Sequence, residues 1–410
     1  MIAYVMSRFP KLSETFILRE MNELERQGYQ IALYPLIFNK EPVVHAEAEA
    51  WIPRMRYSSF ISRDILMTNG RELIRNTGTY GKLWRRVLWE NRTSAKFLSR
   101  AMALFPKAVH MALEMRDEGI VHIHAHFATH PALTAWLIHH LTGIPFSVTV
   151  HAHDIFIDRE MLDTKLGDAA FVVAISDYNR NYLSEVVGNR IQDKTQVIHC
   201  GISPENYVPR PNPRKSGENF EIISIGSLQA YKGYPFLIQA CVLLRDRGIP
   251  FRCRIIGHGE EQERLKKMIA ESNLSAVVEL PGPRSQEHIA KLLPTAHCYV
   301  QSSIIMPSGR MEGIPVSLME AMACHLPVVA SDISGISELV RHGETGWLVP
   351  PANASVLADA LTFVYEHPEQ TWQTARNGRH FVQEAFELSS EVRQLAMLLE
   401  PSGSGHSGPS

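Results

Sequence analysis

Short apolar runs alternate with segments of helical periodicity in the first half of the chain. In residues 14–28, for example, apolar side chains recur at helical spacing until Gly28 ends the pattern. Further helices are expected at residues 131–142 and 177–187. The apolar runs that predict buried strands are residues 2–6, 31–36, 121–127, 146–151, 170–175 and 196–200. Strands that alternate with helices indicate βαβ units and a parallel sheet.

The same alternation returns after a segment rich in proline. Residues 204–217 contain four prolines and little apolar content, which is typical of a linker between domains. Beyond them, strands are expected at residues 221–226, 252–257, 276–280, 298–301, 327–330 and 346–349. Helices are expected to begin near Gly233, Glu260, Ser285, Val316, Gly335 and Ala354. The pattern therefore predicts a second doubly wound α/β domain.

These patterns divide the chain into five parts. Residues 1–203 are expected to form the first domain, 204–219 the linker and 220–370 the second domain. We expect residues 371–400 to form helices that pack back on the first domain. Residues 401–410 are rich in Ser, Gly and Pro, a composition typical of a disordered tail.

Composition and charge narrow the class of protein. An apolar fraction of 45% is ordinary for a well-packed protein, and a formal charge of −2 gives no overall field that would attract nucleic acid or membrane. The five cysteines contain no C-x-x-C pair, so we expect buried thiols in a reducing compartment. The N-terminus lacks a basic segment before its apolar residues, and no apolar run approaches the roughly 20 residues that span a bilayer. Cytoplasmic location is the expectation.

Residues 54–107 differ from this balanced background. They contain twelve basic and three acidic side chains, a formal charge of +9, which leaves −11 for the rest. Aromatic and aliphatic residues are interleaved with the basic ones. One interpretation is a basic amphipathic surface that docks peripherally on an anionic membrane, and the other is a solvated helical face whose aromatic residues belong to the core. No nucleic-acid-binding motif accompanies the segment.

The strongest candidate chemistry lies at the expected strand-to-helix turns, because ligands of open parallel sheets bind beyond the carboxyl ends of the strands. Pro315 suits the first turn of a helix. Free backbone N–H groups at the positive end of that helix would bind a diphosphate. The residues that offer these N–H groups are Gly313, Ile314 and Val316.

Two glutamates frame this turn. Glu312 lies at its mouth, and Glu320 follows about one turn inside the helix, where its carboxylate would bind a vicinal diol such as ribose hydroxyls. A glycosidase pair is an alternative, but two helical carboxylates eight residues apart would be separated by about 12 Å, wider than that chemistry uses. Two structural glutamates are the remaining alternative.

Lysine and histidine candidates follow other strands. Lys232 comes after the turn at Gly226 and just before a helix, where an ammonium would meet phosphate oxygens, although no P-loop motif is present. His153 follows the strand at residues 146–151 and would polarise a hydroxyl near the reacting centre, with Asp154 orienting its ring. The alternating His122, His124 and His126 are expected to be satisfied core residues, because no carboxylate or cysteine near them in the sequence completes a metal-ligand set.

Taken together, these residues resemble the retaining glycosyltransferases of family 4, whose GT-B fold has two Rossmann-like domains facing across a cleft. The resemblance covers residues 1–385, and its most specific motif is the pair Glu312 and Glu320 with the Ala321-Met322-Ala323 segment. Supporting segments are 226–233, 257–260, 335–338 and 345–350. Residues 9–16 resemble the branch that builds exopolysaccharide, colanic-acid-type and lipopolysaccharide chains.

The resemblance implies roles for individual residues. Glu320 would bind the ribose of a nucleotide sugar, Glu312 the donor sugar hydroxyls, and Lys232 the diphosphate leaving group, helped by the Gly313 and Ile314 amides. His153 would lie beside the donor sugar. The further positions are Ser13, Glu14 and Asp154 toward donor phosphate and acceptor, and Pro283 and Arg284 toward the nucleobase. No metal or other cofactor is then expected, because fixed positive charge and the helix dipole stabilise the departing diphosphate.

Two departures from the family pattern bear on activity. Ser227, next to Gly226, occupies the place of the family's usual arginine, and residues 9–16 replace a common glycine pair. Arg310, two residues before Glu312, is our hypothesis for the compensating cation. The expected function is transfer of a sugar from a nucleotide diphosphate sugar to a growing, lipid-linked glycan, at the inner face of the plasma membrane. The alternatives are a GT-B epimerase or phosphorylase, or a catalytically silent partner subunit that binds sugar nucleotides.

Overall fold

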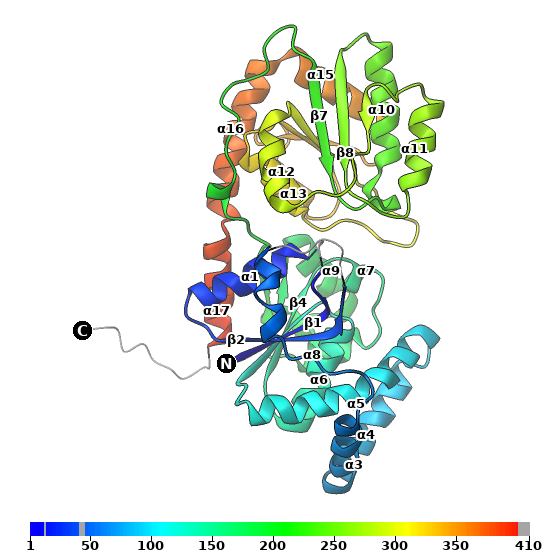
Figure 1. The fold of residues 1–410 in the computed structure, drawn as a ribbon, viewed down its shortest axis with the longest axis vertical. Helices are drawn as coiled ribbons and strands as arrows, with labels where there is room; N and C mark the ends of the chain where they lie inside the picture. Colours follow the sequence, from blue (N-terminus) through cyan, green and yellow to red (C-terminus); the bar gives the residue numbers. More distant parts are fainter. Residues whose placement is uncertain (12–13, 41–45, 401–410) are drawn as a thin grey trace, which may run out of the picture. The chain divides into compact units, whose positions relative to one another are not determined.

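The computed structural model describes residues 1–11, 14–40 and 46–400. Contacts divide the chain into two compact units, each described by itself (Figure 1). The N-terminal unit contains residues 1–175 and 179–199 together with the chain from residue 389 onward. The C-terminal unit contains residues 176–178 and 200–388. The predicted tail, 401–410, lies outside the described residues.

The N-terminal unit is built on a six-stranded parallel sheet with the order β2-β1-β3-β4-β5-β6. Its strands are β1 (Ile2–Phe9), β2 (Ile31–Phe38), β3 (His122–His126), β4 (Phe146–Val150), β5 (Phe171–Ala174) and β6 (Thr195–Val197). Register places His124 beside Ser147 and His126 beside Thr149. β1, β3, β4 and β5 are buried along almost their whole length, which explains why they appear in the sequence as continuous rather than alternating apolar runs.

Figure 1 shows the helices of this unit, most of them packed around the sheet. They are α1 (Thr15–Arg26), α2 (Ala46–Glu49), α3 (Arg63–Arg75), α4 (Thr77–Glu90), α5 (Ala95–Asp117), α6 (His130–Thr142), α7 (His153–Phe156), α8 (Leu162–Asp168), α9 (Asp177–Val187) and α17 (Leu388–Leu399), with the 3-10 turns η1 (Ile52–Arg54) and η2 (Asn189–Lys194). In α6, residues 131–138 are all buried, and the helix ends at Gly143 in the left-handed region. α6 therefore packs as a core helix between the sheet and α5.

α3, α4 and α5 pack against one another and project from the sheet of the N-terminal unit (Figure 1). Ser62 caps α3 by accepting a hydrogen bond from the Ile65 N–H, and Ser94 caps α5 in the same way. Several apolar side chains of this region are exposed: the exposed fractions of Ile61 and Ile74 are 82% and 81%. Other exposed apolar side chains of this region are Tyr57, Leu66, Met67, Leu73, Leu88, Trp89 and Met102.

The C-terminal unit contains a second six-stranded parallel sheet, with the order β12-β11-β10-β7-β8-β9. Its strands are β7 (Phe220–Ile225), β8 (Phe251–Ile256), β9 (Val278–Glu279), β10 (Cys298–Gln301), β11 (Val328–Ser331) and β12 (Trp347–Val349). Its helices are α10 (Tyr234–Asp246), α11 (Gln262–Glu271), α12 (Gln286–Leu292), α13 (Val316–Ala323), α14 (Ile336–Leu339), α15 (Ala354–Glu366) and α16 (Pro368–Ala385), with the 3-10 turns η3 (Pro204–Asn206), η4 (Ala230–Lys232) and η5 (Leu293–Thr295).

Each face of this second sheet has its own apolar core. Ile222 packs in one cluster with α10 and α15, while its neighbour Ile223 packs in the other with α13. Because successive strand residues point to opposite faces, this alternation means that helices cover both sides of the sheet. The predicted doubly wound α/β fold is confirmed in both units.

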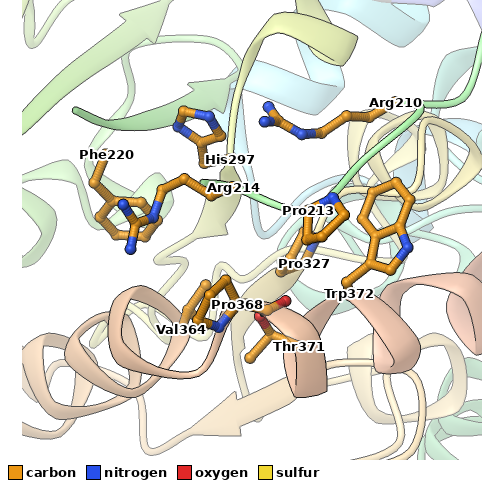
Figure 2. A pocket seen from close by; sticks show the side chains of 10 residues that line it. All are labelled: Arg210, Pro213, Arg214, Phe220, His297, Pro327, Val364, Pro368, Thr371 and Trp372. Carbon is orange, nitrogen blue, oxygen red and sulfur yellow. Dashed lines mark hydrogen bonds between the residues drawn. The ribbon is translucent and has the colours of Figure 1, made fainter. Parts of the chain in front are cut away.

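The proline-rich segment after residue 204 packs on the C-terminal unit. The Arg210 guanidinium donates to the Ala296 carbonyl at 2.6 Å, and the Arg214 guanidinium donates to the Tyr365 carbonyl at 2.7 Å. Figure 2 shows both arginines at a small pocket of this unit, beside Phe220, His297 and Trp372. None of the candidate site residues lines this pocket, so we assign it to the anchoring of the segment rather than to chemistry.

The unit boundaries differ from the sequence-based ones in two ways. The segment 204–219 and α16 are parts of the C-terminal unit. Residues 389–400 belong to the N-terminal unit, in line with the expectation for the last helix, and there the Gln27 side chain donates to the Ser389 carbonyl. Four cysteines are buried and Cys200 is half-buried. Within the described ranges, no helix is long and apolar enough to cross a membrane.

Candidate functional site

The loop after β7 is held by close backbone packing. The Gly226 N–H donates to the Ile256 carbonyl, and the Leu228 N–H donates to the His258 carbonyl at 2.8 Å. Gly257 has a φ of +151°, and a Cβ at this position would collide with the Gly226 carbonyl. The glycine turns therefore bring two βα loops into contact, and they fix the backbone that leads to Lys232.

Lys232 is buried at the end of η4 and forms an ion pair with Glu312. Burial by itself lowers the pKa of Lys232, but the charge and hydrogen bond of Glu312, together with the neighbouring Tyr231 and Tyr234, raise the pKa above its ordinary value. The lysine is thus a fixed cation. Gly226 packs against it, since a Cβ there would lie 3.3 Å from Nζ.

Glu312 precedes α13, which begins at Val316 as expected. Pro315 is the N-cap, with extended backbone angles, rather than a residue of the first turn. The Leu318 N–H donates to the Pro315 carbonyl, so the N–H groups that lack an intrahelical partner are those of Val316 and Ser317. Gly313 and Ile314 lie before the cap, between Glu312 and the positive end of the helix.

Glu320 is buried in α13 and is held by two side chains. Its Oε1 accepts hydrogen bonds from the Tyr207 hydroxyl and from Gln286 Nε2, both at 2.8 Å. Gln286 begins α12, immediately after the loop with Pro283 and the exposed Arg284. The structure thus links Glu320 to the segment predicted to contact the nucleobase. Sequence reasoning missed Tyr207 and Gln286, since one lies in the predicted linker and the other has no motif.

Arg310 lies against the loop of Lys232. Its Nη2 donates to Gln229 Oε1 at 2.5 Å, and its guanidinium carbon lies 4.5 Å from the centre of the Tyr231 ring. Ser227 belongs to the same loop and is partly buried. The Arg310 guanidinium therefore lies against the loop that carries Ser227, although Arg310 itself comes from the segment just before Glu312.

The histidine candidate of the N-terminal unit is exposed. His153 begins α7, and its Nδ1 lies 3.5 Å from Asp158 Oδ2. Asp154 was expected to orient this ring and to border the acceptor, which the structure corrects. The Asp154 carboxylate is buried and accepts hydrogen bonds from the backbone N–H groups of Ala128 and His151, so it stabilises the loop instead.

Glu14 is the N-cap residue of α1 and is buried, with one carboxylate oxygen 2.5 Å from Lys11 Nζ. Ser13, the other expected acceptor contact, lies outside the described residues. Of the candidates, the structure thus joins Lys232 with Glu312 and links Glu320 to the 283–286 segment, all within the C-terminal unit.

The alternating histidines also require a correction. His122 and His124 are hydrogen-bonded to Ser147, as expected for satisfied core residues. However, a carboxylate does complete a possible ligand set, because Glu20 of α1 lies against His124 and His126. Sequence reasoning missed Glu20, which is separated from these histidines by about one hundred residues and becomes their neighbour only when α1 packs on the sheet.

Two families of known proteins match most of the chain. Residues 13–206 match the family described as Glycosyltransferase Family 4, and residues 209–381 match the family described as Glycosyl transferases group 1. The chain is 29% identical to WcaL of Escherichia coli (strain K12), named for colanic acid biosynthesis, over 97% of this chain and 99% of that protein. It is 36% identical to the amylovoran biosynthesis glycosyltransferase AmsK of Erwinia amylovora over 51% of each chain.

Solved structures show the same fold. HepE of Anabaena, determined in complex with UDP, superposes with a TM-score of 0.69 at 17% identity, over 97% of this chain and 99% of that one. Sucrose-phosphate synthase of Thermosynechococcus elongatus superposes with a TM-score of 0.72 at 18% identity, over 97% and 98%. With two Rossmann-like units and these neighbours, the expected GT-B fold is confirmed.

Proposed function

The chain belongs to the family 4 and group 1 glycosyltransferases, and we propose that it transfers a sugar from a nucleotide diphosphate sugar to a lipid-linked glycan in exopolysaccharide or lipopolysaccharide biosynthesis. The observation that carries the proposal is the buried ion pair of Lys232 and Glu312 before α13. It holds a cation and a carboxylate together beside a helix N-terminus. This combination suits a substrate that joins a diphosphate to a sugar.

The donor would bind through the C-terminal unit. The Glu320 carboxylate would accept hydrogen bonds from the ribose hydroxyls, and its bonds from Tyr207 and Gln286 hold it in place for this role. Lys232 and the first-turn N–H groups of α13 would neutralise the diphosphate as negative charge develops on it. These groups are preorganised, which supports transfer without a metal ion at the diphosphate.

The chemical step we propose retains the anomeric configuration. The bond between the anomeric carbon and the diphosphate oxygen breaks, and the acceptor oxygen forms its bond on the same face through an oxocarbenium-like state. The leaving diphosphate oxygen takes the acceptor's proton. Glu312 would bind the donor sugar hydroxyls, and the exposed His153 would lie beside the sugar. Exclusion of water would favour transfer over hydrolysis.

The protein would act at the inner face of the plasma membrane, attached through α3–α5. The +9 charge of residues 54–107 supports this assignment, as do the exposed apolar side chains of α3 and α4. A surface with both features fits an anionic bilayer, which attracts the basic side chains and accepts the apolar ones. A lipid-linked acceptor would then lie in the same membrane to which the protein is attached.

The test is turnover of UDP-, GDP- and ADP-sugars with a lipid-linked saccharide fraction, followed by NMR of the product's anomeric proton. We expect release of one nucleoside diphosphate per sugar transferred, retained configuration, and equal rates with and without added Mg²⁺. An inverted product would contradict the mechanism. Donor binding without turnover would favour the alternative of a catalytically silent partner subunit. The observation behind that alternative is Ser227, which stands where the family usually has an arginine.

A further inference from the structure

A compact group of metal-ligating side chains lies between α1 and the sheet of the N-terminal unit, apart from the donor residues. Glu20 Oε1 is 3.0 Å from His126 Nε2 and 3.9 Å from His124 Nε2. The ligand atoms of all three residues lie within 4.8 Å of one another. Ligands about 2.0–2.1 Å from a tetrahedral zinc ion are separated by about 3.3 Å. The two printed separations lie on either side of this value, and small shifts of the side chains would bring all three ligand atoms to one ion.

The far ring nitrogens of both histidines already have partners. His124 Nδ1 lies 2.7 Å from the Ser147 hydroxyl, and His126 Nδ1 lies 3.3 Å from His151 Nε2. Such contacts fix the orientation of a metal-binding imidazole and leave its other nitrogen for the ion. His124 Nε2 is also 2.9 Å from the Thr149 hydroxyl, which can rotate toward another acceptor when the nitrogen binds a metal.

The carboxylate is oriented in the same manner. The Tyr4 hydroxyl donates to Glu20 Oε1 at 2.7 Å, from the strand next to β3. Within the part of the chain that the structure describes, the only groups that can carry positive charge within 4 Å of the Glu20 oxygens are these two imidazoles. The Glu20 side chain is only 19% exposed, and a metal ion bound here would give its carboxylate a full counter-charge.

The chemistry of the three side chains indicates which metal fits. Two imidazole nitrogens and one carboxylate oxygen form a ligand set that suits zinc rather than Mg²⁺ or Ca²⁺, which prefer oxygen ligands.

We propose that Glu20, His124 and His126 bind one zinc ion that ties α1 to β3. Three protein ligands leave one coordination position for water. This open position is typical of catalytic zinc, but we assign the ion a structural role because its ligands include none of the residues assigned to donor binding or transfer. It would hold α1 on the sheet and with it the N-cap residue Glu14.

The direct test measures metal bound to the full chain. Protein dialysed against Zn²⁺ and then against metal-free buffer is expected to retain about one zinc per chain by mass spectrometry of the metal. Replacement with Co²⁺ should give the visible absorption bands of a site with nitrogen and oxygen ligands. Chelation should lower the melting temperature by several degrees.

Matched variants separate this site from a hydrogen-bonded network. We expect Glu20→Gln and His126→Gln to reduce retained zinc at least tenfold and to abolish the effect of chelation on the melting temperature. His122→Gln is the control, because His122 lies on the same face of β3 but its Nε2 contacts Ser147 instead of Glu20. The Co²⁺ spectrum is measured on the wild-type protein, so it tests the site even if a variant does not fold. Absence of both zinc and cobalt binding, or undiminished zinc in both variants, would overturn the proposal and leave a hydrogen-bonded network only.

Discussion

Lys232 and Glu312 form a buried ion pair although one follows β7 and the other precedes α13. The pairing joins the loop with Gly226 to the helix that carries Glu320. It also keeps the lysine charged in a place where burial alone would favour loss of its proton. Binding of a diphosphate would give this cation a second anionic partner, which makes the pair the natural centre of the proposed donor site.

Replacement of Lys232 tests its role toward the leaving group. We expect Lys232→Ala to lower kcat by about 10²–10³-fold, the effect of removing one preorganised donor to a developing negative charge, with a smaller change in donor affinity. Lys266→Ala, an exposed lysine of α11, is the control. The melting temperature of the variant shows whether the loss of the Lys232 partner of Glu312 also lowers the stability of the fold. Wild-type kcat in Lys232→Ala would exclude a role in turnover.

Arg310 tests whether a cation replaces the one missing at Ser227. We expect Arg310→Ala to weaken donor binding and to slow turnover, because the guanidinium lies against the loop of Ser227 and Lys232. The double variant Ser227→Arg with Arg310→Ala should recover part of the loss. Steady-state kinetics with varied donor measure both effects, and unchanged turnover and affinity in Arg310→Ala would remove the hypothesis.

The surface formed by α3–α5 predicts binding to anionic membranes. The protein should sediment with phosphatidylglycerol–phosphatidylethanolamine vesicles at low salt and be released as salt screens the basic side chains. The paired variant Leu66→Glu and Ile74→Glu should bind several-fold more weakly. Met397→Glu, at a side chain of α17 that is 61% exposed, is the control. Absence of sedimentation at every ionic strength would return residues 54–107 to the interpretation of a solvated face.

His130 predicts how stability depends on pH. Burial, with the charges of Lys165 and Arg100, lowers the pKa of His130 to about 4. Because the folded pKa lies below the unfolded value of about 6.5, the stabilisation is complete above pH 6.5 and is lost as the pH falls toward 4. His130→Gln should remove up to about 3 kcal/mol of this loss. Denaturant titrations at pH 7 and 4.5 measure the change in the free energy of unfolding. The variant His380→Gln, at an exposed histidine, is the control. An equal pH dependence in His130→Gln and the wild type would contradict the assignment.

The fold could be predicted from the sequence because buried parallel strands appear as continuous apolar runs. β7 and β8 begin within one residue of their expected positions. α13 begins at Val316 as expected, but Pro315 is its N-cap and not part of its first turn, since proline suits both positions. The assignment of 204–219 and α16 to the C-terminal unit could not be predicted, because it depends on contacts such as that of Arg214 with the Tyr365 carbonyl.

The candidate site was predictable only where a local pattern carries it. Glu312 and Glu320 are close in sequence, and Lys232 follows a glycine turn, so spacing identified them. Side chains from distant elements were missed, as with Glu20 beside His126 and Tyr207 beside Glu320. Asp154 was misassigned because its partners are backbone N–H groups of loops, which no sequence pattern reveals.

The most direct test of the central claim is a thermal-shift screen against UDP, GDP, ADP and their common sugar conjugates. A ligand that binds only the folded state raises the melting temperature, by about 5 °C at about 100 times its Kd. We predict such a shift with one nucleotide family in the wild-type protein and its loss in Glu320→Ala, while Glu344→Ala, an exposed glutamate of the same unit, retains it. No shift with any nucleotide, or an equal shift in Glu320→Ala, would contradict the proposed donor site.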